Sequence, residues 1–328
     1  MLKRWLSVAL KFAVSGLLIW FLLGTIDLVA AQARLVEVAP AMLGLSLAVL
    51  VVQILISVVR WGAVLDALEA SLPFMTALRL FMIGAFFNQT LPSSVGGDGV
   101  RMYMAHRAGL KLGAAINGVM LERAAVVAAL VLVVLAAQPY LVSRVGDEVA
   151  AWLVPAALLF AAAIAAAIVF LSFLDRLPAS LHRWRLVRGL AILAGDTRRV
   201  FLRPGHAFRV LGWSVLGHVN VTLCVYVLAL GLKLDVTLME CLALFPPVLL
   251  VTTLPISIAG WGVREGAMVA AFGLVGVPSE GALVLSLLFG LVAMAVSLPG
   301  GLVWLRSGER RSNIPVPAVA EAAVEGEE

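Results

Sequence analysis

A twelve-residue stretch that occurs twice constrains this chain more than any other feature. Residues 90–101 have the sequence TLPSSVGGDGVR and residues 253–264 the sequence TLPISIAGWGVR. The copies share their Pro, two glycines and the final Arg, whereas Asp98 is replaced by Trp261. Such a repeat indicates two related halves. Each copy is a Gly- and Pro-broken stretch between apolar segments, and interrupted segments at matching places in two halves point to a binding site in membrane proteins.

The composition assigns the chain to a membrane. Hydrophobic residues make up 62% and charged residues 13%, and the mean hydropathy is +1.07. A soluble domain has roughly half apolar and a quarter charged residues, so we predict an all-α integral membrane protein, a polytopic helical bundle. At about 20 apolar residues per crossing, the length suits roughly six to nine segments. The Lys and Arg residues lie in loops beside apolar segments, which favours anionic lipid headgroups over nucleic acid as partners.

Apolar runs and breaks predict where the helices lie. A retained first helix is expected over about 8–26, a second over 40–59 and a strongly apolar one over 114–137, which Pro139 ends. Residues 60–73 are expected to form a loop, with Arg60 and Arg79 as anchors at the membrane interface. Further helices are expected over about 74–91, 100–108, 152–174, 210–230, 240–254, 262–275 and 283–305.

The distribution of Lys and Arg predicts the topology. It puts the N-terminus, the basic segment 175–209 and a disordered tail, 306–328, in the cytoplasm. Residues 99–111 form only about 20 Å of helix, too short for a core of about 30 Å. We therefore predict that a transmembrane domain, 1–305, contains two inverted halves, about 1–137 and 151–305, each with a re-entrant hairpin. In the alternative, every arm of the hairpins crosses the membrane. This would put Arg107 and Lys111 outside, against the enrichment of Lys and Arg in cytoplasmic loops.

The broken hairpins suggest an anion site. Irregular backbone at membrane depth is tolerated only where protein covers it or where it lines a wet cavity. A new helix begins after each break, and its free N–H groups and positive dipole end attract anions. Arg101 and Arg264 lie in that first turn and add donor forks suited to phosphate. The alternative is that both hairpins are packing elements whose arginines pair with nearby carboxylates, such as Asp98 and Glu265.

Glu122 and Arg123 are charged residues inside an apolar helix. They lie about 12 Å into it by the rise per residue, and two charges at a helix centre cost roughly 5–7 kcal/mol on the insertion scale. Both should therefore point into the bundle or a cavity, and because adjacent residues do not share a helix face, each needs its own partner. Asn88 is expected to cap the broken backbone or to contact a ligand. His218 and Asn220 are expected to be interhelical hydrogen bonders rather than a proton relay.

Three segments resemble a known family. FFNQTLPSSVGGDGVR, GVMLERAAVV and LPISIAGWGVREGA resemble the flippase-like transmembrane domain of the lysylphosphatidylglycerol synthase family, over about residues 5–305. The resemblance implies a stand-alone bacterial cytoplasmic-membrane member, without room for the soluble aminoacyl-transferase domain of longer members, that moves a lipid between leaflets. The candidate substrate-binding residues are Asn88, Ser94, Gly97, Asp98, Arg101, Glu122, Arg123, Ser257, Gly260, Arg264 and Glu265.

We therefore predict a flippase or transporter for an amphiphile with an anionic, phosphate-bearing headgroup. A phospholipid or a polyprenyl phosphate fits this description, and an oligomer is possible. The alternatives are an integral-membrane transferase acting on lipid-linked substrates and a channel or assembly subunit. The sequence shows no His–carboxylate pair at helical spacing and no set of metal ligands, so we predict no enzyme activity, metal or cofactor.

Overall fold

The computed structural model describes residues 32, 38–90, 96–144, 146–176, 185–253 and 260–307. Over these residues the chain forms helices and no strands, which confirms the all-α prediction. Within them, five helices are long and apolar enough to cross a membrane: α3 (Pro40–Ala67), α6 (Leu112–Arg144), α7 (Asp147–Ser172), α9 (Pro204–Gly231) and α12 (Ser279–Arg306). The chain is therefore a multi-pass membrane protein. The expected first helix and the tail lie outside the described residues.

Shorter helices stand between the long ones. They are α4 (Phe74–Thr90), α5 (Gly96–Arg107), α10 (Leu238–Thr252) and α11 (Val263–Gly273). The order long, short, short, long is thus found in α3–α6 and again in α9–α12. One copy of the repeat lies at the junction of each short pair and includes the start of its second helix.

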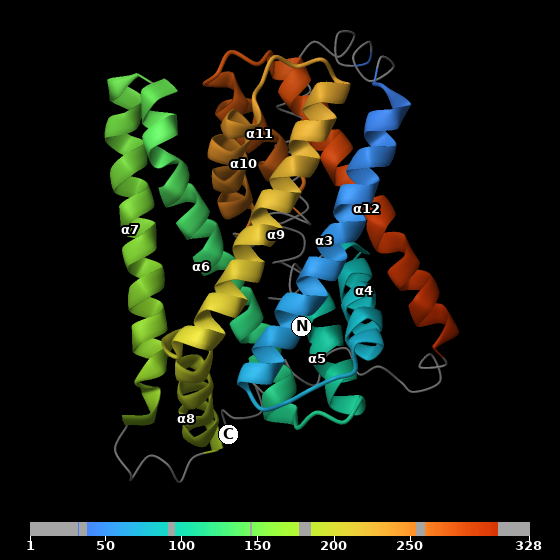
Figure 1. Cartoon of the computed structure of the whole chain (residues 1–328), viewed down its shortest axis with the longest axis vertical. Helices are drawn as coiled ribbons and strands as arrows, with labels where there is room; N and C mark the ends of the chain where they lie inside the picture. Colours follow the sequence, from blue (N-terminus) through green and yellow to red (C-terminus); the bar gives the residue numbers. More distant parts are fainter. Residues whose placement is uncertain are drawn as a thin grey trace, which may run out of the picture.

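The two sets of four helices run in opposite directions. In Figure 1, α3 runs downward and α9 upward, while α6 runs upward and α12 downward. The pair α4–α5 lies at the lower end and α10–α11 at the upper end. Helix α3 packs against α9, α4 against α12, and α10 against α6, so one short helix of each set packs against a long helix of the other. Because the fold alone does not place a bilayer, the inverted repeat and the re-entrant hairpins stay predictions.

Two helices continue well beyond their predicted C-terminal ends. Helix α3 begins at Pro40, as expected for a Pro in the first turn, but it continues to Ala67, so the loop predicted to start at residue 60 was wrong. Helix α6 continues through Pro139 to Arg144, so its predicted end was also wrong. A Pro inside a helix removes one hydrogen bond and can bend the helix without ending it.

The basic segment is more structured than its charge suggested. It contains the short 3₁₀ turn η1 (Leu174–Arg176), helix α8 (Arg185–Thr197) and the π-helical turn η3 (Arg198–Leu202). Leu193 and Val200 are buried in a cluster with α3 and α6 side chains, so one face of the segment packs on the bundle. Arg198 donates hydrogen bonds of 2.8 and 2.6 Å to Asp175, and these bonds hold the pKa of Asp175 below its ordinary value.

Polar side chains and small residues join the long helices. His218 of α9 donates to the Val126 carbonyl of α6 at 2.9 Å, and Asn220 donates to the Val49 carbonyl of α3 at 3.0 Å. Both contacts are interhelical, as expected. A Cβ added to Gly300 of α12 would lie 2.0 Å from a backbone oxygen of α4. The chain therefore needs Gly at this position for α12 to approach α4.

Candidate functional site

A buried carboxylate joins three helices. Glu122 of α6 is 2% exposed and lies between α3 and α5. Its Oε1 accepts from Nε of Arg60 on α3 at 2.9 Å, and its Oε2 accepts from Nη2 of Arg101 on α5 at 2.6 Å. Each carboxylate oxygen thus has a guanidinium from a different helix. Taking these charges out of water is costly, and only such close pairing offsets the cost.

The neighbouring Arg123 faces another partner. It donates to Asp98 of α5 through two bonds of 2.7 and 3.0 Å. The Arg123 side chain is 49% exposed, whereas Asp98 is buried. Asp98 also lies 3.4 Å from Arg101, which links the two pairs. As expected from their positions on different helix faces, Glu122 and Arg123 have separate partners.

These contacts define one cluster, which we call the ion network: Arg60, Asp98, Arg101, Glu122 and Arg123. It contains three guanidinium groups and two carboxylates, so it carries one excess positive charge. The prediction that Arg60 anchors the chain at the membrane interface was wrong, because Arg60 is buried and pairs with Glu122. The signal that could have found it is the need of Glu122 for a buried cationic partner.

Arg101 lies at the centre of the network. Its guanidinium carbon is 4.9 Å from the centre of the Trp61 ring and 5.1 Å from that of Phe81, distances at which a cation is attracted to an aromatic face. Its Nε is buried and has no hydrogen-bond partner among the described residues. A buried donor usually has an acceptor, and leaving one without costs about 1–3 kcal/mol.

Local sequence explains how α5 reaches this place. The side chain of Asn88, near the end of α4, accepts a hydrogen bond from the backbone N–H of Gly97 at 3.0 Å. Asn88 therefore caps the start of α5, which was one of its two expected roles. A Cβ on Gly97 would lie 2.0 Å from the Gly84 carbonyl oxygen. Glycine at this position is therefore what allows α4 and α5 to lie so close together.

The second repeat builds a smaller cluster. Arg264 donates to Oε1 of Glu265 at 2.7 Å and to the hydroxyl of Ser286, on α12, at 3.2 Å. The other oxygen of Glu265 accepts from the backbone N–H of Gly262 at 2.6 Å, which caps α11. This cluster has one positive and one negative side chain. Sequence reasoning missed Ser286, whose residue type alone gives no signal of its role.

Glycine and aromatic residues shape the space around Arg264. Gly260 and Gly262 have φ values of +81° and +86°, which disfavour any side chain. The Arg264 guanidinium lies 4.8 Å from the centre of the Trp261 ring. A Cβ on Gly290 of α12 would lie 2.3 Å from Nη2 of Arg264, so this glycine leaves room for the guanidinium.

The two copies of the repeat therefore place their arginines alike. Arg101 and Arg264 are both buried, lie against aromatic rings and pair with carboxylates, which is the arrangement of the packing alternative. An anion site at membrane depth stays a prediction. Ser94 and Ser257 lie outside the described residues. Within the described residues, no group of His, Cys, Asp and Glu side chains could hold a metal ion.

The fold and the ion network together define a multi-pass helical membrane protein with buried charges beside an interrupted helix pair. The family model of the lysylphosphatidylglycerol synthase TM region matches residues 8–301, and the chain belongs to this family. No curated protein matched the chain. Membership indicates a function related to membrane lipids.

Proposed function

We propose that this protein moves a lipid with an anionic, phosphate-bearing headgroup between the leaflets of the bacterial cytoplasmic membrane. The observation that carries the proposal is the ion network, which concentrates one excess positive charge where α3, α5 and α6 meet. Intramembrane charges that have no functional role are rare because they are costly. Family membership supports the choice of a lipid as substrate.

Arg123 is the contact point for the headgroup. Its side chain is half-exposed, and a guanidinium fork matches the geometry of phosphate oxygens. A phosphate that binds Arg123 competes with Asp98 for the same donors. Because Asp98 and Arg101 lie on α5, whereas Glu122 and Arg123 lie on α6, this exchange weakens the attachment of α5 to α6. Headgroup binding is thereby coupled to movement of the α4–α5 pair.

The opposed helix pairs support passage between leaflets. The breaks between α4 and α5 and between α10 and α11 are approached from opposite ends of the molecule in Figure 1. In transporters with inverted repeats, such discontinuous helices form the substrate site and the two halves alternate in opening it. The Lys and Arg distribution supports a cytoplasmic N-terminus and a cytoplasmic segment 175–209.

A translocation assay tests this function. The protein is reconstituted into liposomes that carry a fluorescent phosphatidylglycerol, and loss of outer-leaflet fluorescence after adding a membrane-impermeant quencher gives the rate. The matched variants are Arg123→Gln and Arg144→Gln, since the Arg144 side chain is 51% exposed and lies on the same helix. We expect Arg123→Gln to slow translocation about tenfold or more, the equivalent of one lost charge-assisted contact. Arg144→Gln should stay within about twofold of wild type by the same reasoning.

Two results would overturn the proposal. The first is that wild-type liposomes move neither phosphatidylglycerol nor a polyprenyl phosphate faster than empty ones. The second is that both arginine variants translocate at the wild-type rate. The first result would favour the alternative of a transferase or an assembly subunit, for which product formation from lipid-linked substrates and co-purified partners are the next measurements.

A further inference from the structure

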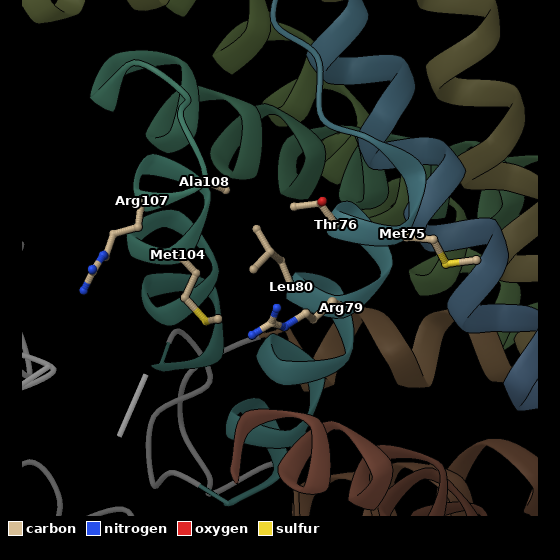
Figure 2. A pocket seen from close by; sticks show the side chains of 7 residues that line it. All are labelled: Met75, Thr76, Arg79, Leu80, Met104, Arg107 and Ala108. Atoms are coloured by element: carbon tan, nitrogen blue, oxygen red, sulfur yellow. The ribbon is translucent and has the colours of Figure 1, made fainter. Parts of the chain in front are cut away.

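A cavity of about 460 Å³ lies between the two arms of the α4–α5 pair, at the end away from the break. Its size falls within the range of ligand pockets. Seven side chains line it, as Figure 2 shows: Met75, Thr76, Arg79, Leu80, Met104, Arg107 and Ala108. None of them is acidic, and two of them, Arg79 and Arg107, are cationic.

The lining combines cationic and apolar chemistry. In Figure 2, Arg79 extends from α4 toward α5, while Arg107 is turned away from it. Arg107 is exposed and forms no ion pair with any described residue, so it can rotate toward the cavity at the cost of rotamer freedom alone. Leu80 and Met104 form an apolar wall, and Met75, at 72% exposure, extends it outward. A phosphate next to an acyl chain fits this lining.

The cavity also lies close to the ion network. Arg107 follows Arg101 by six residues on α5, which is about 9 Å along the helix axis. Leu80, which lines the cavity, precedes Phe81, the ring that lies against Arg101. The cavity therefore lies about one or two helical turns from Arg101, a member of the ion network.

We propose that this cavity binds the phosphate headgroup of an anionic glycerophospholipid, with Arg79 and Arg107 as its donors and Met75, Leu80 and Met104 against the acyl chain. In the context of the proposed function, on which this role rests, the cavity loads the lipid before it reaches the ion network. The chemistry of the site requires an anionic phosphate and an apolar chain in one molecule.

Equilibrium binding tests the site without requiring transport. The purified full chain is titrated with short-chain phosphatidylglycerol and followed by native mass spectrometry. The variant Arg79→Gln/Arg107→Gln is compared with Arg203→Gln/Arg306→Gln, which has the same net charge. Arg203 precedes α9 and Arg306 ends α12, at the same end of the molecule as the cavity, and neither lines it. We expect about tenfold or greater loss of affinity in the first variant and wild-type affinity in the second.

Competition identifies the source of the phosphate. Short-chain phosphatidylcholine should bind at least about tenfold more weakly than phosphatidylglycerol, and inorganic phosphate should fail to displace the lipid at equal concentration. The site would be overturned if Arg79→Gln/Arg107→Gln bound phosphatidylglycerol with the same affinity as Arg203→Gln/Arg306→Gln. It would also be overturned if the wild type bound phosphatidylcholine as tightly as phosphatidylglycerol. Displacement by inorganic phosphate would overturn the lipid assignment. If the double variant is poorly folded, Arg107→Gln is compared with Arg306→Gln, which again has the same net charge.

The two proposals fail separately. If wild-type protein binds phosphatidylglycerol but does not translocate it, the proposed function is overturned and the cavity site stands. Unchanged binding in the Arg79→Gln/Arg107→Gln variant would overturn the cavity site while the translocation rates of wild type and Arg123→Gln still decide the function.

Discussion

Replacement of Glu122 by Gln should destabilise the protein more than the loss of any exposed acid. The carboxylate accepts hydrogen bonds from Arg60 at 2.9 Å and from Arg101 at 2.6 Å, and all three side chains are buried. Gln keeps the shape but removes the negative charge. Two guanidinium groups then share one amide oxygen, with Asp98 at 3.4 Å from Arg101 as the remaining carboxylate.

The magnitude follows from the burial of the pair. Removing one partner of a buried ion pair costs about 3–5 kcal/mol, because the remaining charge is left uncompensated. An exposed pair contributes about 0–1 kcal/mol. Asp66 provides the matched control, since it pairs with Arg209 at 3.4 Å and both side chains are at least half-exposed. Asp66→Asn makes the same chemical change as Glu122→Gln in water rather than in the bundle.

Thermal unfolding in one detergent at a fixed scan rate gives the comparison. With about 2–4 °C per kcal/mol for a chain of this order of size, Glu122→Gln should lower Tm by about 6 °C or more, and Asp66→Asn by about 4 °C or less. Combining Glu122→Gln with Arg60→Gln should recover part of the loss, by about 1 kcal/mol or more. Equal melting of the two single variants would refute the inference that Glu122 holds two buried arginines.

Single contacts elsewhere give further expected outcomes. Gly97→Ala should lower the free energy of unfolding by about 2 kcal/mol or more, because the new Cβ would collide with the backbone of α4. At Gly99 the same change meets open space and should leave the stability unchanged or raise it by up to about 1 kcal/mol. Equal Tm values for the two variants would contradict this inference. Arg198→Gln should lower Tm at neutral pH, since Arg198 depresses the pKa of Asp175. That difference should shrink as pH falls below the ordinary Asp value of about 3.9 toward the depressed pKa, and a difference that does not shrink on acidification would contradict the pairing. Arg123→Cys should react with a membrane-impermeant maleimide, because intramembrane arginines face wet cavities and both native cysteines are buried; absence of labelling would exclude a wet cavity there.

The sequence predicted the features that depend on local chemistry. The high apolar content identified a helical membrane protein because a bilayer admits few other structures. The repeat marked the two places where short helix pairs form. The positions of Glu122 and Arg123 on different faces of one helix required separate partners, since helix geometry is fixed by residue spacing. The capping of α5 by Asn88 followed from the helix end that the break creates.

The partners themselves came only from the tertiary structure. Arg60 is separated from Glu122 by 62 positions, and Ser286 is separated from Arg264 by 22, so no local pattern connects them. The continuation of α3 beyond Arg60 depends on the contact between Arg60 and Glu122. Because this buried partner compensates the charge of Arg60, the helix does not have to end at the membrane interface. Residue spacing determines which face a side chain occupies, but burial and pairing depend on which helices are brought together, and that is decided by the packing of the whole chain.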